Sequence, residues 1–336
     1  MGNINNGWEP PPYPIIKIVG VGRHGIESII SLGNAHKNQA DRRHDCSQTV
    51  LASIAHITVS TSEQTHSMGT GITELLLQAN GLQKPGENDS FELNLRAYQL
   101  NRERIADTFE GAHLIIIVAD IDCHRTFDMT QLVAEVAHQT GALAAAFIVG
   151  SCPSKSQEDS GIIDHEIEVL LKSLNSVVVI PSDVLFPVFS EKEIRAIEVN
   201  KCIPEVFQQG VRDITDFIKA TFLLGTALGD LKLILSEGGF SRMGIGIGVG
   251  VDRAQIAARM ALSSPLLKGN LQDAQSILFL VSGGNNLGIS EITRAASQAE
   301  EIVGPNANIL VGSSIEGFVR DDIQVSIIAT HISKNV

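Results

Sequence analysis

Short, continuous apolar runs alternate with segments of helical spacing over the first 180 residues of the chain. A continuous apolar run is typical of a strand whose two faces are both covered, as in a parallel sheet. Strands are predicted over residues 15–19, 54–60, 114–119, 142–149 and 177–180. Helices are predicted over residues 26–32, 72–79, 93–110, 132–139 and 162–174. The alternation predicts an α/β domain with a parallel sheet and right-handed crossovers.

The second half of the chain follows a different pattern. Residues 190–220 have mostly helical spacing, and a glycine-rich stretch over 238–250 follows them. Beyond it, helices are predicted over 254–262 and 290–303, and strands over 276–282, 309–313 and 323–330. We therefore predict a flexible N-terminal tail over residues 1–14, an α/β domain over 15–189, a central helical region over 190–220 and a C-terminal α+β domain over 221–333.

The chain is acidic and poor in aromatic residues. It has 25 Lys and Arg against 38 Asp and Glu, a net charge of −13, and 4% aromatic residues. Such a surface repels nucleic-acid phosphates and anionic lipid, so we expect no nucleic-acid partner and no direct membrane contact. The four cysteines form no CxxC pair, which favours a reducing compartment. A cytoplasmic location is predicted.

Three glycines between the first predicted strand and helix form a GxGxxG sequence: Gly20, Gly22 and Gly25. In a dinucleotide-binding unit, such glycines let the backbone approach a pyrophosphate at a helix N-terminus. The acidic residue that should follow the second strand is represented by Glu63 alone. A strand-to-helix turn that needs glycine for its geometry is the simpler interpretation.

Several motifs of the second half follow one another in a characteristic order. They are MGIG at 243–246, DRA at 252–254, SSPLL at 263–267, SGG at 282–284 and NANI at 306–309, with IPSDVL at 180–185 and QGV at 209–211 upstream. Together they resemble FtsZ, the bacterial tubulin homologue, over residues 15–331. The resemblance implies a GTP-binding α/β domain, a central helix and a C-terminal α+β domain. It also implies head-to-tail polymers, in which an acidic loop of one subunit completes the GTPase site of the next.

The resemblance assigns nucleotide contacts to three segments: Gly22, Arg23, His24 and Gly25; Asp122, Cys123, His124, Arg125 and Thr126; and Ser182 and Asp183. A phosphate cradle needs glycines, because backbone N–H groups must face the anion without a Cβ in the way. The family's first loop reads GGGGNN, and here Arg23 and His24 stand between the two remaining glycines. Its main loop reads GGGTGTG, whereas residues 122–128 contain no glycine and two carboxylates, and Asp120 replaces another glycine. Arg125 offsets part of this negative charge. We predict weak or no binding of GTP or GDP, and Mg²⁺ only where GTP binds.

The family's catalytic loop, NxDFADV, corresponds to residues 225–231. Its Asn becomes Gly225 and its first Asp becomes Ala227, while Asp230 is kept. Asp230 could polarise a water as the remaining catalytic carboxylate. The alternative is an acidic residue at the N-cap or in the first turn of a helix.

A dense set of metal-ligating side chains surrounds the altered main loop: Asp120, Asp122, Cys123, His124 and Asp128. Mixed oxygen, nitrogen and sulfur donors could hold Zn²⁺, and His24 could approach them across the edge of the sheet. Their spacing matches no established metal motif. A solvated polar loop over a former nucleotide cleft is the simpler interpretation, and no metal site is predicted.

The leading hypothesis is an FtsZ-like protein of cell division or filament organisation. It would act through self-association or association with FtsZ-type subunits, with weak or lost GTP hydrolysis. The alternatives are an unusual filament-forming GTPase and a small-molecule or dinucleotide sensor that uses the turn at residues 20–25. Because the sequence ends at Val336, soon after the last predicted strand, we expect the family's C-terminal adaptor-binding peptide to be absent.

Overall fold

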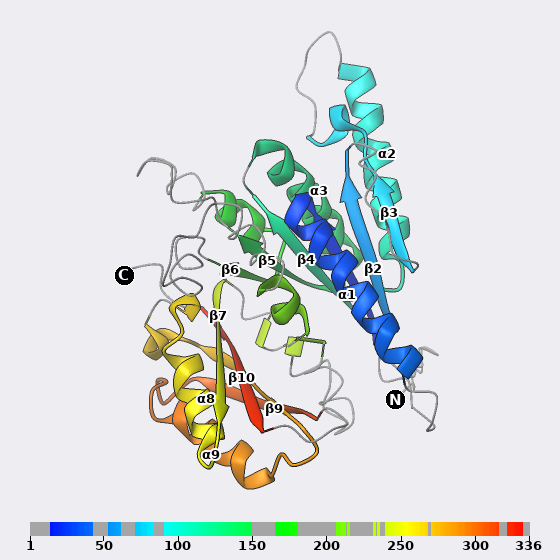
Figure 1. Ribbon diagram of the computed structural model, residues 1–336. Coiled ribbons are helices and arrows are strands. Elements are labelled where there is room, and N and C mark those ends of the chain that lie inside the picture. The colour runs from blue at the N-terminus through cyan, green and yellow to red at the C-terminus, as the bar shows by residue number, and fades with distance from the viewer. Residues whose placement is uncertain are drawn as a thin grey trace, which may run out of the picture.

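A computed structural model gives the fold of this chain. It describes residues 14–42, 53–61, 71–83, 91–121, 123–149, 165–180, 206–212, 214–215, 231–232, 234–235, 239–267, 270–315 and 321–331. Their strands form one ten-stranded sheet in the order β3-β2-β1-β4-β5-β6-β7-β10-β8-β9 (Figure 1). Among these residues, no helix is long and apolar enough to cross a membrane.

The first six strands are parallel, and all but β3 were predicted as strands: β1 (Ile15–Val21), β2 (Ser53–Ser60), β3 (Ile72–Leu76), β4 (Leu114–Asp120), β5 (Leu143–Val149) and β6 (Ser176–Ile180). Every residue of β4, β5 and β6 is buried, which explains their continuous apolar runs. The helices between them are α1 (Gly22–Arg42), α2 (Phe91–Phe109) and α3 (His124–Thr140). Residues 165–171 are also helical.

Helices cover both faces of this parallel sheet. On one face, Ile29 and Leu32 of α1 pack with Ile16 and Ile18 of β1. On the other face, α2 and α3 pack against the alternate positions of the same strands, with Ile105 of α2 fully buried. Two apolar layers therefore fix where each helix begins relative to the strand that precedes it.

The prediction of a helix over residues 72–79 was wrong. Residues 72–76 form strand β3, which pairs in parallel with β2 at the edge of the sheet. Ile72, Leu75 and Leu76 share helical spacing, but five residues are too few to separate that period from a half-buried edge strand. The neighbouring helix α1 is longer than the predicted span over residues 26–32.

The C-terminal part contains β7 (Phe240–Val249), α8 (Arg253–Leu262), β8 (Ser276–Gly283), α9 (Ile289–Glu300), β9 (Asn308–Ile315) and β10 (Asp322–Thr330). Strand β10 runs antiparallel to both β7 and β8, while β8 and β9 are parallel. Helices α8 and α9 share an apolar layer with this part of the sheet. The predicted helices and strands after residue 250 are confirmed, together with the α+β character of this unit.

Strand β7 was not predicted, because glycine at alternate positions weakens a strand pattern. Gly244, Gly246 and Gly248 alternate along it, and a Cβ on any of them would collide with the backbone of α8. The glycines therefore let the helix lie directly on the strand. β7 joins the parallel sheet through two paired positions, Val177 with Phe240 and Val178 with Ser241.

The proposed domain boundaries at residues 189–190 and 220–221 lie outside the described residues. Of the predicted central helical region, residues 206–212 and 214–215 are described and helical. Of the predicted tail over residues 1–14, residues 1–13 are likewise not described. The division into domains remains a prediction.

Candidate functional site

The candidate site lies where β1 and β4 end beside each other. Val21 pairs with Ala119 in the parallel register. Helix α1 begins at Gly22, directly after β1, and α3 begins at His124, soon after β4. The N–H groups at the starts of two helices, each with a positive dipole end, therefore meet at the carboxyl ends of adjacent strands, where α/β folds bind anions.

The GxGxxG glycines of this turn are required by close backbone approach. A Cβ on Gly20 would meet the carbonyl oxygen of Gly25, and a Cβ on Gly25 would meet the carbonyl oxygen of Val118. Gly22 has a φ of +75°, a left-handed conformation that favours glycine. Packing of α1 onto β1 and β4 thus accounts for this glycine spacing, which is the interpretation that the sequence favoured.

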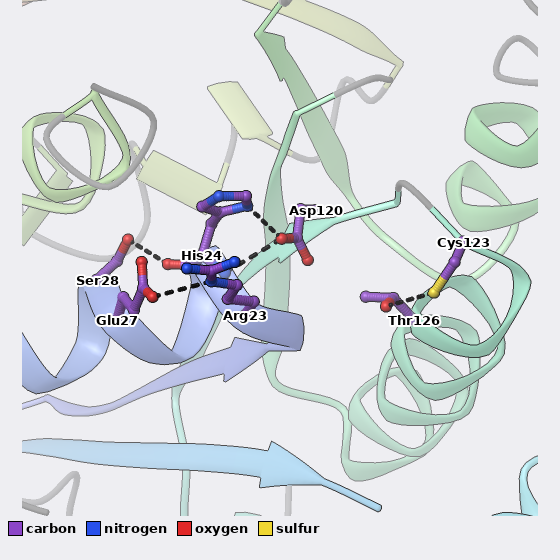
Figure 2. A network of polar contacts seen from close by, with 7 residues as sticks. All are labelled: Arg23, His24, Glu27, Ser28, Asp120, Cys123 and Thr126. Carbon is purple, nitrogen blue, oxygen red and sulfur yellow. Dashed lines mark hydrogen bonds and ion pairs between the residues drawn. The ribbon is translucent and has the colours of Figure 1, made fainter. Parts of the chain in front are cut away.

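The last residue of β4, Asp120, places its carboxylate at the start of α1 (Figure 2). Its Oδ2 atom accepts a hydrogen bond from the backbone N–H of His24 at 3.1 Å. The same oxygen lies 2.5 Å from Nδ1 of the His24 imidazole, which donates because a carboxylate can only accept. A Cβ on Gly22 would collide with Oδ1 of Asp120 and would lie 2.6 Å from Cγ2 of Thr126. The carboxylate therefore lies against the first turn of α1, and Thr126 of α3 lies close to the same glycine.

This contact is buried and changes the titration of the histidine. Asp120 is 3% exposed and His24 8%. The hydrogen bond to Asp120 raises the pKa of His24; desolvation opposes this, while nearby Glu27 adds to the rise and Arg23 reduces it. The imidazolium form of His24 is therefore favoured. Within the part of the chain that the structure describes, two buried atoms of the pair, His24 Nε2 and Asp120 Oδ1, have no hydrogen-bond partner.

The outer surface of the turn is charged. Arg23 forms an exposed i,i+4 ion pair with Glu27 at 3.2 Å. On the inner side, the hydroxyl of Ser28 donates to the carbonyl oxygen of His24 at 2.6 Å. The sequence gave no reason to select Ser28, although its position four residues after His24 places it one helical turn away.

The segment that corresponds to the family's main glycine loop is largely helical here. Cys123 is the N-cap of α3, and its Sγ lies 3.2 Å from Oγ1 of Thr126. His124 and Arg125 are exposed in the first turn, while Thr126 is buried. Helix α3 thus begins where a phosphate loop would need extended, glycine-rich backbone.

Not all of the acidic residues predicted near the main loop lie beside His24. Asp128 accepts a hydrogen bond from Gln83 Nε2 at 2.6 Å, so it is engaged with the segment after β3. Asp122, Ser182, Asp183 and Asp230 lie outside the described residues. Of the described acidic residues near the main loop, Asp120 is the one that the structure brings to His24, as the approach across the sheet edge suggested.

The described residues do not fit a phosphate group at the start of α1. The His24 N–H is hydrogen-bonded to Asp120, and a buried carboxylate lies where an anion would bind. The same residues also offer no metal centre: no group of three or more His, Cys, Asp or Glu side chains among them could hold an ion.

Comparison with known proteins agrees with the sequence motifs. Residues 239–333 match the FtsZ family, C-terminal domain. Over 317 residues the chain is 28% identical to the cell division protein FtsZ of Pseudomonas aeruginosa, an alignment that covers 94% of this chain and 77% of that protein.

Solved structures share the fold over nearly the whole chain. An empty FtsZ dimer from M. jannaschii matches with a TM-score of 0.75 and 21% identity, covering 96% of this chain and 89% of that one. A GTPγS-bound protofilament of CetZ2 from Haloferax volcanii matches with a TM-score of 0.67 and 12% identity, covering 95% and 94%. The predicted resemblance to the FtsZ/tubulin superfamily is confirmed, as is the predicted fold.

Proposed function

We propose that this chain, which has the FtsZ/tubulin fold and an FtsZ-type C-terminal domain, is a cytoskeletal subunit that assembles with weak or lost GTP binding and hydrolysis. Its partners are copies of itself or FtsZ-type subunits. The relative in Pseudomonas aeruginosa is a cell division protein, and the CetZ2 structure is a protofilament. These relationships support a role in cell division or filament organisation.

The Asp120 carboxylate is the observation that carries the loss of nucleotide binding. A phosphate at the start of a helix is held by free backbone N–H groups and by the positive end of the helix dipole. Here the His24 N–H already donates to Asp120, and the carboxylate adds a negative charge at the same place. A phosphate and the Asp120 carboxylate are charges of like sign and repel each other, and the His24 imidazolium offsets part of that repulsion.

The surrounding residues strengthen the proposal. Where the family has glycines, Arg23 and His24 carry side chains, and the imidazole of His24 is buried beside Asp120. The start of α3 presents His124 and Arg125 to the surface. Arg125 remains the side chain through which an unusual GTPase could still attract a phosphate, so the test has to measure both binding and turnover.

Calorimetry with GTP and Mg²⁺ on the full chain tests this proposal, together with sedimentation of polymers in the presence of GTP, GDP or no nucleotide. We expect no measurable binding heat, no phosphate release and the same pelleted fraction in all three conditions. Micromolar GTP affinity with turnover would contradict the proposal and support the unusual GTPase. If the chain never pellets alone, co-sedimentation with an FtsZ-type subunit distinguishes mixed assembly from no assembly.

A further inference from the structure

We propose that Asp120 is a built-in anion that closes the junction of α1 and α3 against phosphate-containing ligands, and that His24 is the counter-charge that holds it there. The inference rests on the proposed function, because Asp120 is the group that excludes the nucleotide. Its new element is that the rest of the junction can still bind an oxyanion once the charge of Asp120 is removed.

The carboxylate lies where the two helices converge. Oδ2 binds the backbone N–H and the imidazole of His24 at the start of α1. Oδ1 lies against Gly22, the first residue of α1, close to Thr126 in the first turn of α3. Helix α1, of 21 residues, therefore directs its N-terminal end at this side chain, and α3, of 17 residues, begins soon after the strand that carries it. An anion at the start of α1 is favoured by the dipole of that helix.

The incomplete bonding of this carboxylate distinguishes it from an ordinary structural ion pair. Asp120 is almost completely buried, yet its Oδ1 atom has no hydrogen-bond partner among the described residues. A buried carboxylate normally has both oxygens bonded, because an unsatisfied one loses its hydration without compensation. The side chain is thus held mainly by the helix starts and by His24, as a bound oxyanion would be.

The charges around His24 are consistent with this role. Asp120 and Glu27 favour the imidazolium, whereas Arg23 disfavours it. Arg23 is paired with Glu27 on the surface, so Asp120 is the partner that contacts the ring. The junction therefore contains its own anion and its own cation, and its geometry does not depend on a nucleotide.

Calorimetric titration of the full chain with sodium tripolyphosphate, at fixed ionic strength, tests the inference. The wild type is compared with Asp120→Asn, which removes the charge and keeps the shape, and with Asp120→Gly, which also opens the space. Asp107→Asn is the matched control, because it removes one negative charge at an exposed position of α2. We expect both Asp120 variants to bind tripolyphosphate at least about 100-fold more tightly than the wild type and the control.

A second variant, His24→Asn, keeps the anion and removes its counter-charge. We expect it to bind no better than the wild type. Gain of binding by His24→Asn but not by Asp120→Asn would overturn the inference, because the imidazole would then be the group that excludes phosphate. Failure of folded Asp120→Asn to gain affinity would overturn it as well, while wild-type GTP binding would remain absent and the proposed function would stand.

Discussion

The β1–α1 turn and the β7–α8 pair are two places where glycine brings a strand into contact with a helix. An ion pair accompanies each of them: the buried His24–Asp120 pair and the partly buried Arg253–Glu291 pair. On β7, Gly244, Gly246 and Gly248 all face the backbone of α8. In the β1–α1 turn, Gly20 and Gly25 likewise lie so close to neighbouring backbone carbonyl groups that a Cβ would not fit. The glycines that packing requires are thus present in both regions.

The two regions differ at positions where no close backbone contact requires glycine. Between Gly22 and Gly25 the family's loop has glycine, but this chain has Arg23 and His24. Arg23 is largely exposed, and the His24 side chain occupies space beside Asp120. Both regions therefore keep the glycines that backbone contact requires, whereas side chains stand at residues 23 and 24, between two glycines of the β1–α1 turn.

The two ion pairs differ in how completely their polar atoms are hydrogen-bonded. Arg253 binds both carboxylate oxygens of Glu291, at 2.8 and 3.1 Å, and also donates to the carbonyl oxygen of Asn286. Glu291 in turn accepts from the N–H of Gly288 at the start of α9, and the hydrogen bonds from Arg253 are the main cause of its lowered pKa. This pair joins α8 to the cap of α9. The pair at Asp120 joins α1 to β4 but leaves buried polar atoms unbonded in the described part of the chain.

Breaking the Arg253–Glu291 pair should lower the free energy of unfolding more than any other substitution considered. Glu291→Ala removes the carboxylate that binds Arg253, whose side chain is 10% exposed, and also removes the α9 cap. We expect a loss of about 3 kcal/mol in the free energy of unfolding, measured by urea denaturation. Glu300→Ala, at an exposed position of the same helix, should change it by less than about 0.5 kcal/mol. Equal effects of the two substitutions would show that the buried pair is not special.

The next effect concerns packing glycines. Gly246→Ala places a methyl group against the backbone of Ala257 and 2.7 Å from Cβ of Met260, so α8 must move. We expect a destabilisation of about 2 kcal/mol, measured in the same way. Val249→Ala on the same strand is the control, because Val249 is 62% exposed and its truncation should cost little. A stable Gly246→Ala protein would remove the packing explanation for these glycines.

The smallest effect is the pH dependence of the Asp120 pair. Because the folded-state pKa of His24 is raised, its stabilising contribution is complete below the unfolded value of about 6.5 and is lost as the pH rises through the folded pKa. Asp120→Asn should therefore lower stability by about 1 kcal/mol at pH 6 and by less at pH 9. Thermal unfolding at both pH values measures this difference, with Asp107→Asn as control. A difference that grows with pH would contradict the assignment of the imidazolium.

Most of the parallel sheet was predictable because its strands are buried on both faces. β4 and β5 are continuous apolar runs, and Gly111 and Gly141, which end helices, have φ values of +71° and +75°. Strand β3 and strand β7 were not predictable in the same way. β3 is a short edge strand, and β7 carries glycines that are needed because the backbone of α8 packs directly on them.

The candidate site was predictable in its composition but not in its contacts. The sequence showed that side chains replace glycines at residues 23 and 24 and that carboxylates surround the main loop. It did not show which carboxylate contacts His24, because Asp120 and His24 are 96 positions apart in the sequence. The parallel register of β1 and β4 brings them together, and that register is a property of the folded sheet.

The narrow join between β6 and β7 has a mechanical consequence. β7 is paired with β10 at nine positions but with β6 at two, supported by a hydroxyl contact of 2.8 Å between Ser176 and Ser241. Load carried along a sheet is shared among the hydrogen bonds that cross each strand boundary. Of these two ladders, the short one is therefore the weaker under tension. Force applied across the sheet should therefore part β7 from β6 before it parts β7 from β10.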